Sequence, residues 1–161
     1  MKHLRCVTTA LAPLALLAAC SSAPRPAAEV PAALLNPSVT PQNVQQTICV
    51  PAYAASVMPP EAQLRGVMLE IMQRAGMDPA LAGSYVLDHR IPVGLGGHPS
   101  ERANLQILER GGAYGAQRKQ ALQRRLLLRV CENKMGLREA QAAMYPEWEP
   151  AYGLYVTGPA R

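Results

Sequence analysis

The most informative stretch of this chain covers residues 85–108 and reads YVLDHRIPVGLGGHPSERANLQIL. An apolar run ends in the adjacent pair Asp88 and His89, a turn rich in glycine and proline follows, and Asn104 precedes a second apolar run. The glycines bend the chain and the first run has strand composition, so the pattern predicts a hairpin-like element. The second run fits either a strand or the beginning of a helix.

Histidine is scarce in this sequence, with three residues in all: His3, His89 and His98. His3 lies in the N-terminal segment, and we expect His98 to be an exposed residue of the turn. A histidine that titrates near neutral pH can take a proton from a nucleophile. A carboxylate such as that of Asp88 can bind a divalent cation. If the chain does chemistry, the pair at 88 and 89 is therefore its first candidate site.

Several residues have the spacing of an HNH-type site: Asp88-His89, Ile91-Pro92, Gly96-Gly97 and Asn104-Leu105. At these positions the chain resembles the HNH endonuclease family. The resemblance is strongest over about residues 85–120 and extends more loosely over 47–152, where the chain is similar to an exported, HNH-signature branch. It implies an α+β fold, in which a small and mainly helical domain surrounds a ββα-metal hairpin.

The resemblance also implies roles for individual residues. His89 would be the general base, and Asp88 would be a ligand of one divalent metal ion (Mg, Mn, Ni or Zn). Asn104 would act with His89 by bonding across the hairpin and holding the backbone and ring of the histidine. The implied activity is hydrolysis of phosphodiester bonds in DNA or RNA.

The helix expected over 116–130 departs from the family pattern. Many HNH proteins have a metal-binding histidine there, but no histidine follows His98 in this chain. The exported branch often has Ala-x-x-Lys-Asp-x-x-Glu, whereas Gln120 and Gln123 replace both acids here. Neutral amides are poorer ligands for a hard cation than carboxylates. The departure favours an alternative function, a catalytically degenerate HNH-fold lipoprotein that binds nucleic acid or a cell-envelope partner.

Positive charge is concentrated in the second half of the chain. Between residues 102 and 138 there are nine Lys and Arg but two acids, a local charge of +7. Such a surface suits a phosphate backbone. The residues expected to contact phosphate are Arg90, Arg118, Lys119 and Arg125. A solvated helix face, or a face that meets anionic lipid or lipopolysaccharide, would have the same composition.

The N-terminus has the features of a bacterial export signal. Lys2 and Arg5 precede an apolar segment that is too short to span a bilayer. The segment ends in Leu17-Ala18-Ala19-Cys20, which resembles a lipobox. We therefore expect a lipoprotein signal peptide over 1–19 and a lipidated Cys20. The alternative is an ordinary cleaved signal peptide, with Cys20 a free thiol that has no particular role. Because Ser21 rather than an aspartate follows, the expected location is the outer membrane, facing the periplasm.

The mature chain divides into a tether and one domain. Five prolines, at 24, 26, 31, 37 and 41, predict an extended, lipid-anchored tether over 20–42. Residues 43–161 are long enough for one modest core. Loss of Lys2 and Arg5 with the signal reduces the net charge from +5 to +3.

Two cysteines remain in the domain, Cys49 and Cys131. Disulfides persist in exported proteins, so we expect a bridge between them, with two buried free thiols as the alternative. The absence of any CxxC pair makes a zinc finger a poor explanation. Apolar residues at helical spacing from Leu64 to Met72 predict a further helix that begins at Glu61 and ends at Gly76.

Overall fold

The computed structural model describes residues 29–158. Its helices and strands are α1 (Tyr53–Val57), α2 (Glu61–Arg74), β1 (Tyr85–His89), β2 (Leu105–Glu109), α3 (Ala116–Cys131), α4 (Leu137–Ala142) and α5 (Glu149–Tyr152). Short helical turns join them: η1 (Ala32–Leu34), η2 (Val44–Gln46), η3 (Pro79–Ser84), η4 (Val93–Leu95), η5 (Arg102–Asn104) and η6 (Gly153–Thr157). The predicted α+β class is confirmed.

The two strands form one antiparallel sheet. Tyr85 lies opposite Glu109, and His89 lies opposite Leu105. The second apolar run, which the sequence left open between strand and helix, is therefore a strand. Because His89 is the last residue of β1, the loop of residues 90–104 starts directly from the candidate base.

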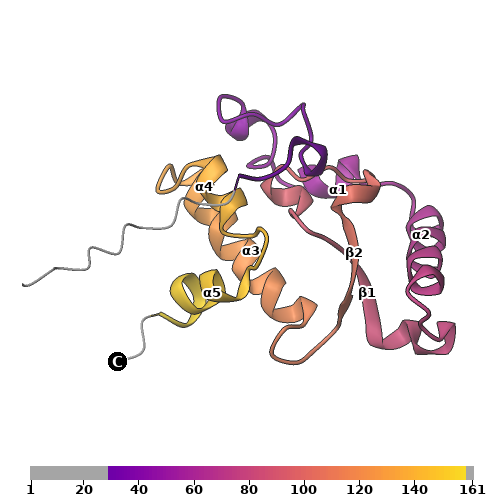
Figure 1. Cartoon of the computed structure of the whole chain (residues 1–161). Helices are drawn as coiled ribbons and strands as arrows, with labels where there is room; N and C mark the ends of the chain where they lie inside the picture. The colour runs from indigo at the N-terminus through magenta and orange to yellow at the C-terminus, as the bar shows by residue number, and fades with distance from the viewer. Residues whose placement is uncertain (1–28, 159–161) are drawn as a thin grey trace, which may run out of the picture.

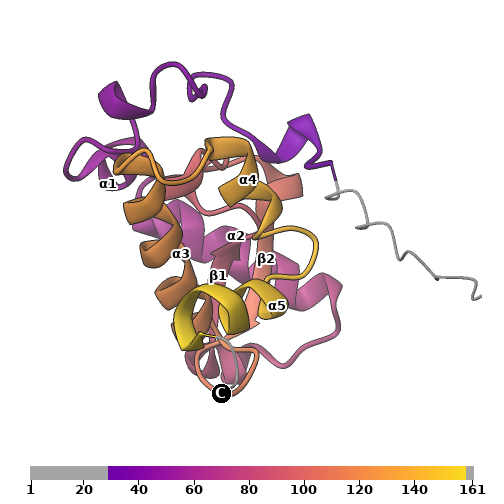
Figure 2. The same ribbon diagram turned by 90° about the vertical axis from the view of Figure 1, so that its left-hand side faces the viewer.

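The hairpin lies between α2 on one side and α3 on the other (Figure 1). The helix α3 carries the core, because Leu122, Leu126 and Val130 lie on one face and are buried. The shorter helices α4 and α5 pack against α3 (Figure 2). Residues of the loop 90–104, among them Ile91 and Leu95, complete this core, and η4 brings the glycine turn against α3.

The expectation of an extended tether through residue 42 is wrong for its second half. Leu34 and Val39 are buried, and Leu35 forms an isolated β-bridge with Gly97. The backbone N–H of His98 donates to the carbonyl of Leu34 at 2.9 Å. The apolar residues between the prolines therefore bury surface that offsets the entropy of ordering this segment. The segment from Val30 onward is therefore part of the domain.

The predicted disulfide between Cys49 and Cys131 is confirmed. It joins the segment before α1 to the last residue of α3 across 82 residues of sequence. Closing a loop of this length stabilises a fold by about 4–5 kcal/mol in the chain-entropy model, which is an upper figure. The bridge also holds α1 beside the candidate site.

The helix α2 confirms the predicted helix that begins at Glu61. Its apolar face contacts the hairpin, but among its residues Met72 alone is buried. No helix among residues 29–158 is long and apolar enough to cross a membrane. The predicted signal peptide over 1–19 and the lipidation site Cys20 lie outside the described residues.

Candidate functional site

The candidate site is a small pocket where β1, η4 and α3 meet. Its volume is about 210 Å³. Asp88 and His89 line it from the end of β1, and Gln120 and Gln123 line it from α3. Ala54 and Met58, from α1 and its C-terminal end, form a further wall together with residues 92–94. The fold thus brings the predicted base and the two glutamines into one polar pocket.

The imidazole of His89 is held by one hydrogen bond. Its Nε2 lies 2.9 Å from the carbonyl oxygen of Pro99. Because a carbonyl can only accept, the proton of the neutral ring belongs on Nε2, and this assignment follows from the hydrogen-bond network. The lone pair of the neutral ring is then on Nδ1, which has no hydrogen-bond partner within residues 29–158. This nitrogen is therefore the basic atom of His89.

Burial lowers the pKa of His89 below its ordinary value of 6.5. The hydrogen bond to Pro99 and the negative charge of Asp88 oppose this shift, while Lys119 adds to it. Desolvation is the largest effect because charging a ring away from water is unfavourable. The ring is consequently neutral at neutral pH, the state in which it can accept a proton.

Asn104 closes the loop rather than touching the histidine ring. Its amide is fully buried, accepts from the N–H of Ile91 at 2.8 Å, and donates to the carbonyls of Ile91 and His98, each at 2.9 Å. The sequence-based expectation that Asn104 holds the ring of His89 is thus wrong. Asn104 is a positioning residue, because it fixes the loop whose Pro99 carbonyl binds the ring.

Gly97 is required by the same loop. A Cβ atom at this position would lie 1.8 Å from the carbonyl oxygen of Ile91 and 2.9 Å from Nδ2 of Asn104. Backbone can approach backbone this closely only where no side chain intervenes. The Gly-Gly motif therefore serves the closed loop geometry.

The carboxylate of Asp88 is paired with a buried lysine from α3. The Oδ2 atom of Asp88 accepts from Nζ of Lys119 and, at 2.8 Å, from Nε2 of Gln106. Lys119 is 2% exposed, and its ammonium also donates to the carbonyl of His89 at 2.6 Å. Burial lowers the pKa of Lys119, and the charge and hydrogen bond of Asp88 oppose that shift. The predicted phosphate contact by Lys119 is therefore wrong, because the ammonium faces inward.

The residues around Asp88 do not fit a divalent cation. No group of three or more histidine, cysteine or acidic residues within residues 29–158 lies close enough to hold a metal ion. Asp88 already has an ammonium on its carboxylate, and the neighbouring Gln120 and Gln123 are neutral. A second cation at Asp88 would be repelled by Lys119 and would lack the carboxylates that hard ions prefer.

The arginines predicted to bind phosphate come from two segments of the chain, the residue after β1 and the helix α3. Arg90 is exposed and follows His89 directly. Arg118 instead lies over the ring of Tyr152 in α5, with 5.2 Å from its guanidinium carbon to the ring centroid. Arg125 is seven residues further along α3, and helical geometry places it on the same flank as Arg118.

The pocket also has features that sequence reasoning missed. Arg124 lies four residues after Gln120 and therefore on the pocket side of α3. A neighbouring depression of about 330 Å³ shares Ala54, Gly94 and Gln123 with the pocket and continues to the disulfide. The helical spacing would have shown the first feature, but the second depends on the position of α1.

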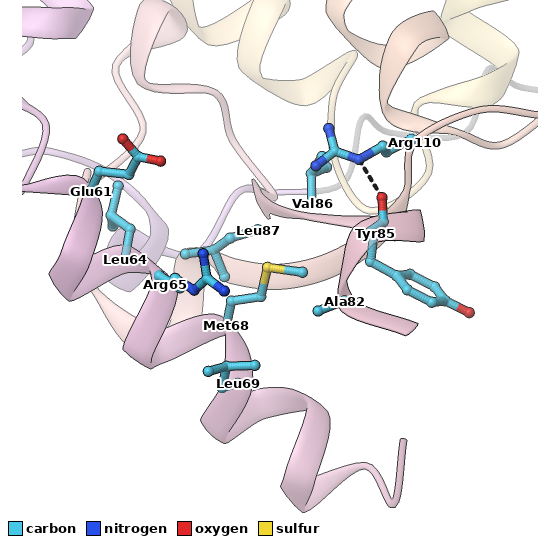
Figure 3. Close-up of a pocket in the computed structure, with 11 residues that line it drawn as sticks. Glu61, Leu64, Arg65, Met68, Leu69, Ala82, Tyr85, Val86, Leu87 and Arg110 are labelled. Atoms are coloured by element: carbon cyan, nitrogen blue, oxygen red, sulfur yellow. Dashed lines mark hydrogen bonds between the residues drawn. The ribbon is translucent and has the colours of Figure 1, made fainter. Parts of the chain in front are cut away.

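Another pocket, of about 350 Å³, lies between α2 and β1 (Figure 3). It is lined mainly by apolar side chains such as Leu64 and Met68, with Arg65 and Arg110 also lining it. The Nε of Arg110 donates to the carbonyl of Gly83 at 2.7 Å. None of its lining residues is a histidine or cysteine, so it offers neither an imidazole base nor a thiol nucleophile.

Comparison of the chain with protein-family models, with curated proteins and with solved structures found no match. The HNH-like interpretation therefore rests on the residues of the hairpin and on their arrangement.

Substitution of Gly97 by alanine tests the closed loop. We expect Gly97→Ala to lower the free energy of unfolding by about 3 kcal/mol or more, because the new Cβ overlaps backbone that cannot move independently. Gly111→Ala is the matched control, since a Cβ there has no neighbour within 4 Å. Urea denaturation followed by Trp148 fluorescence measures both, and equal losses in the two variants would contradict the steric argument.

The titration of His89 is a second test. We expect its imidazole to titrate below 6.5 by NMR, with His89→Gln identifying the signal. Between 6.5 and the lower folded pKa the unfolded chain binds more protons, so the contribution of His89 to stability is complete above that window and declines as the pH falls through it. An imidazole of His89 that titrates at or above 6.5 would show that burial does not dominate.

Proposed function

We propose that this chain is an exported, lipid-anchored protein that acts on nucleic acid through an HNH-like hairpin, with His89 as the base of a phosphodiester-cleaving site. The observation that carries the proposal is the hydrogen bond from Nε2 of His89 to Pro99, because it leaves Nδ1 as an unprotonated base at a polar pocket. The lowered pKa of His89 supports the same role.

The chemistry of the pocket favours RNA as the substrate. Residues 29–158 offer a base but no donor set for an ion that would activate water. A nucleophile that the substrate itself supplies is therefore favoured. A ribose 2′-hydroxyl is such a nucleophile, and intramolecular attack gains a high effective concentration. DNA lacks this group.

In the proposed step Nδ1 of His89 takes the proton of the 2′-hydroxyl. The 2′ oxygen forms a bond to phosphorus, and the bond from phosphorus to the 5′ oxygen breaks. The products are a 2′,3′-cyclic phosphate and a 5′-hydroxyl, whose proton comes from solvent. The guanidinium of Arg90, exposed beside the base, would stabilise the negative charge on the phosphate.

A binding module without catalysis is the second candidate function. It is favoured by the pairing of Asp88 with Lys119 and by the neutral glutamines at 120 and 123. The exposed arginines Arg90 and Arg124 would then contact the phosphate backbone beside the pocket. Affinity would fall with salt as counterions compete.

One assay separates the two functions. The purified full-length protein is incubated in EDTA with single-stranded RNA and, separately, with plasmid DNA. His89→Gln keeps a donor for Pro99 but removes the base, and we expect it to reduce RNA cleavage by about 10²-fold or more. His98→Asn is the matched control, because its amide oxygen can replace Nδ1 of His98 as acceptor for Ser100 and Glu101.

Equal RNA cleavage by His89→Gln and wild type would remove His89 from the mechanism. A salt-dependent gel shift without cleavage in any variant would support the binding module. Cleavage of DNA that requires an added divalent ion would contradict the choice of RNA. If the protein produces no cleavage and no gel shift, both proposed functions are contradicted.

The proposed anchor is tested separately. The motif Leu17-Ala18-Ala19-Cys20 supports lipidation, and the proposed location is the outer membrane, facing the periplasm. We expect Cys20→Ala to abolish partition of the protein into the detergent phase, because the acyl chains are lost. Unchanged partition would contradict the lipoprotein assignment.

A further inference from the structure

Lys119 is the one charged residue that is buried among residues 29–158. Its side chain lies on the core-facing stripe of α3, three residues before Leu122 and seven before Leu126. Helical spacing therefore turns the ammonium inward toward the end of β1. A buried charge is tolerated where it is paired and hydrogen-bonded, so its partners explain its presence.

Those partners are oxygen atoms from two consecutive residues. The Nζ atom donates to the carboxylate of Asp88 and to the backbone carbonyl of His89. One carboxylate and one carbonyl oxygen, held by the end of a strand, are the kinds of ligand that hard cations use. The ammonium of Lys119 thus lies where a cation bound to Asp88 would lie.

The orientation of the carboxylate is fixed from a second side. Nε2 of Gln106, which lies opposite Asp88 in β2, donates to the same Oδ2 atom that Lys119 contacts. The carboxylate is therefore held in place by the sheet as well as by the lysine. Removal of the ammonium alone leaves the carboxylate held by Gln106 beside the carbonyl of His89, and leaves the negative charge of Asp88 uncompensated.

We propose that the ammonium of Lys119 is the built-in cation of this site. It takes the position of a divalent ion, so that the wild-type protein binds no ion at Asp88. A neutral residue at 119 then converts Asp88 and the carbonyl of His89 into part of an ion-binding site. The inference concerns the same pocket as the proposed function but does not depend on nucleic-acid binding.

Thermal unfolding of the full-length protein with and without Mn²⁺ tests the inference. We expect wild type and Lys134→Met, a control at an exposed lysine, to show no shift in Tm at millimolar Mn²⁺. Lys119→Met should be less stable in EDTA, and Mn²⁺ should raise its Tm by about 5 °C. The double variant Asp88→Asn/Lys119→Met should lose that response, because the carboxylate is gone.

Lys119→Met can fail to fold in EDTA, because it leaves Asp88 without its counter-charge. Recovery of a cooperative transition on addition of Mn²⁺ then supports the inference. If it stays unfolded, Lys119→Gln decides, since its amide can still donate to Asp88 while carrying no charge. Its failure to respond to Mn²⁺ overturns the inference.

A Tm shift of the wild type that disappears in Asp88→Asn also overturns it, because Asp88 would then bind an ion beside Lys119. Equal responses of Lys119→Met and the double variant do so as well, because the ion would then bind elsewhere. Nucleic acid is absent from these measurements. Failure of the nuclease proposal is therefore distinguishable from failure of this one.

Discussion

The ion pair between Lys119 and Asp88 links the two parts of the fold that make the pocket. Asp88 belongs to β1, and Lys119 belongs to the first turns of α3, so the pair fixes the hairpin against the helix. A buried charge that loses its partner costs about 3–5 kcal/mol, which makes any separation of the two elements unfavourable. The pocket at His89 is lined from both β1 and α3, so its shape depends on how this ion pair holds the strand against the helix.

The loop of residues 90–104 depends on a second set of buried polar contacts. Asn104 binds both backbone groups of Ile91, and Gly97 leaves room for the same carbonyl. These contacts close the loop onto β2 and carry the carbonyl of Pro99 to the ring of His89. The orientation of the base is a consequence of a closed loop rather than of any direct contact between Asn104 and His89.

Local patterns predicted much of the fold. The apolar periodicity of α2 and α3 identified both helices, because it is a property of short stretches of sequence. The glycine turn identified the hairpin. The two cysteines identified the disulfide, because disulfides persist in exported proteins. The order in residues 29–42 was missed, since Leu34 and Val39 gain their burial from distant partners. The inward position of Lys119 is visible in its spacing from Leu122, but its pairing with Asp88 requires the fold, because 31 residues separate the two.

The same ion pair also determines how His89 behaves. Asp88 alone would raise the pKa of the neighbouring imidazole, and Lys119 alone would lower it. Because the two opposite charges lie in contact, their effects on His89 partly cancel, and desolvation remains the dominant influence. A divalent metal ion at Asp88 would place a net positive charge beside the ring of His89, whereas the single charge of the ammonium only neutralises the carboxylate. The lysine that α3 directs into the end of the hairpin therefore compensates the charge of Asp88 beside the ring, while burial keeps the imidazole neutral.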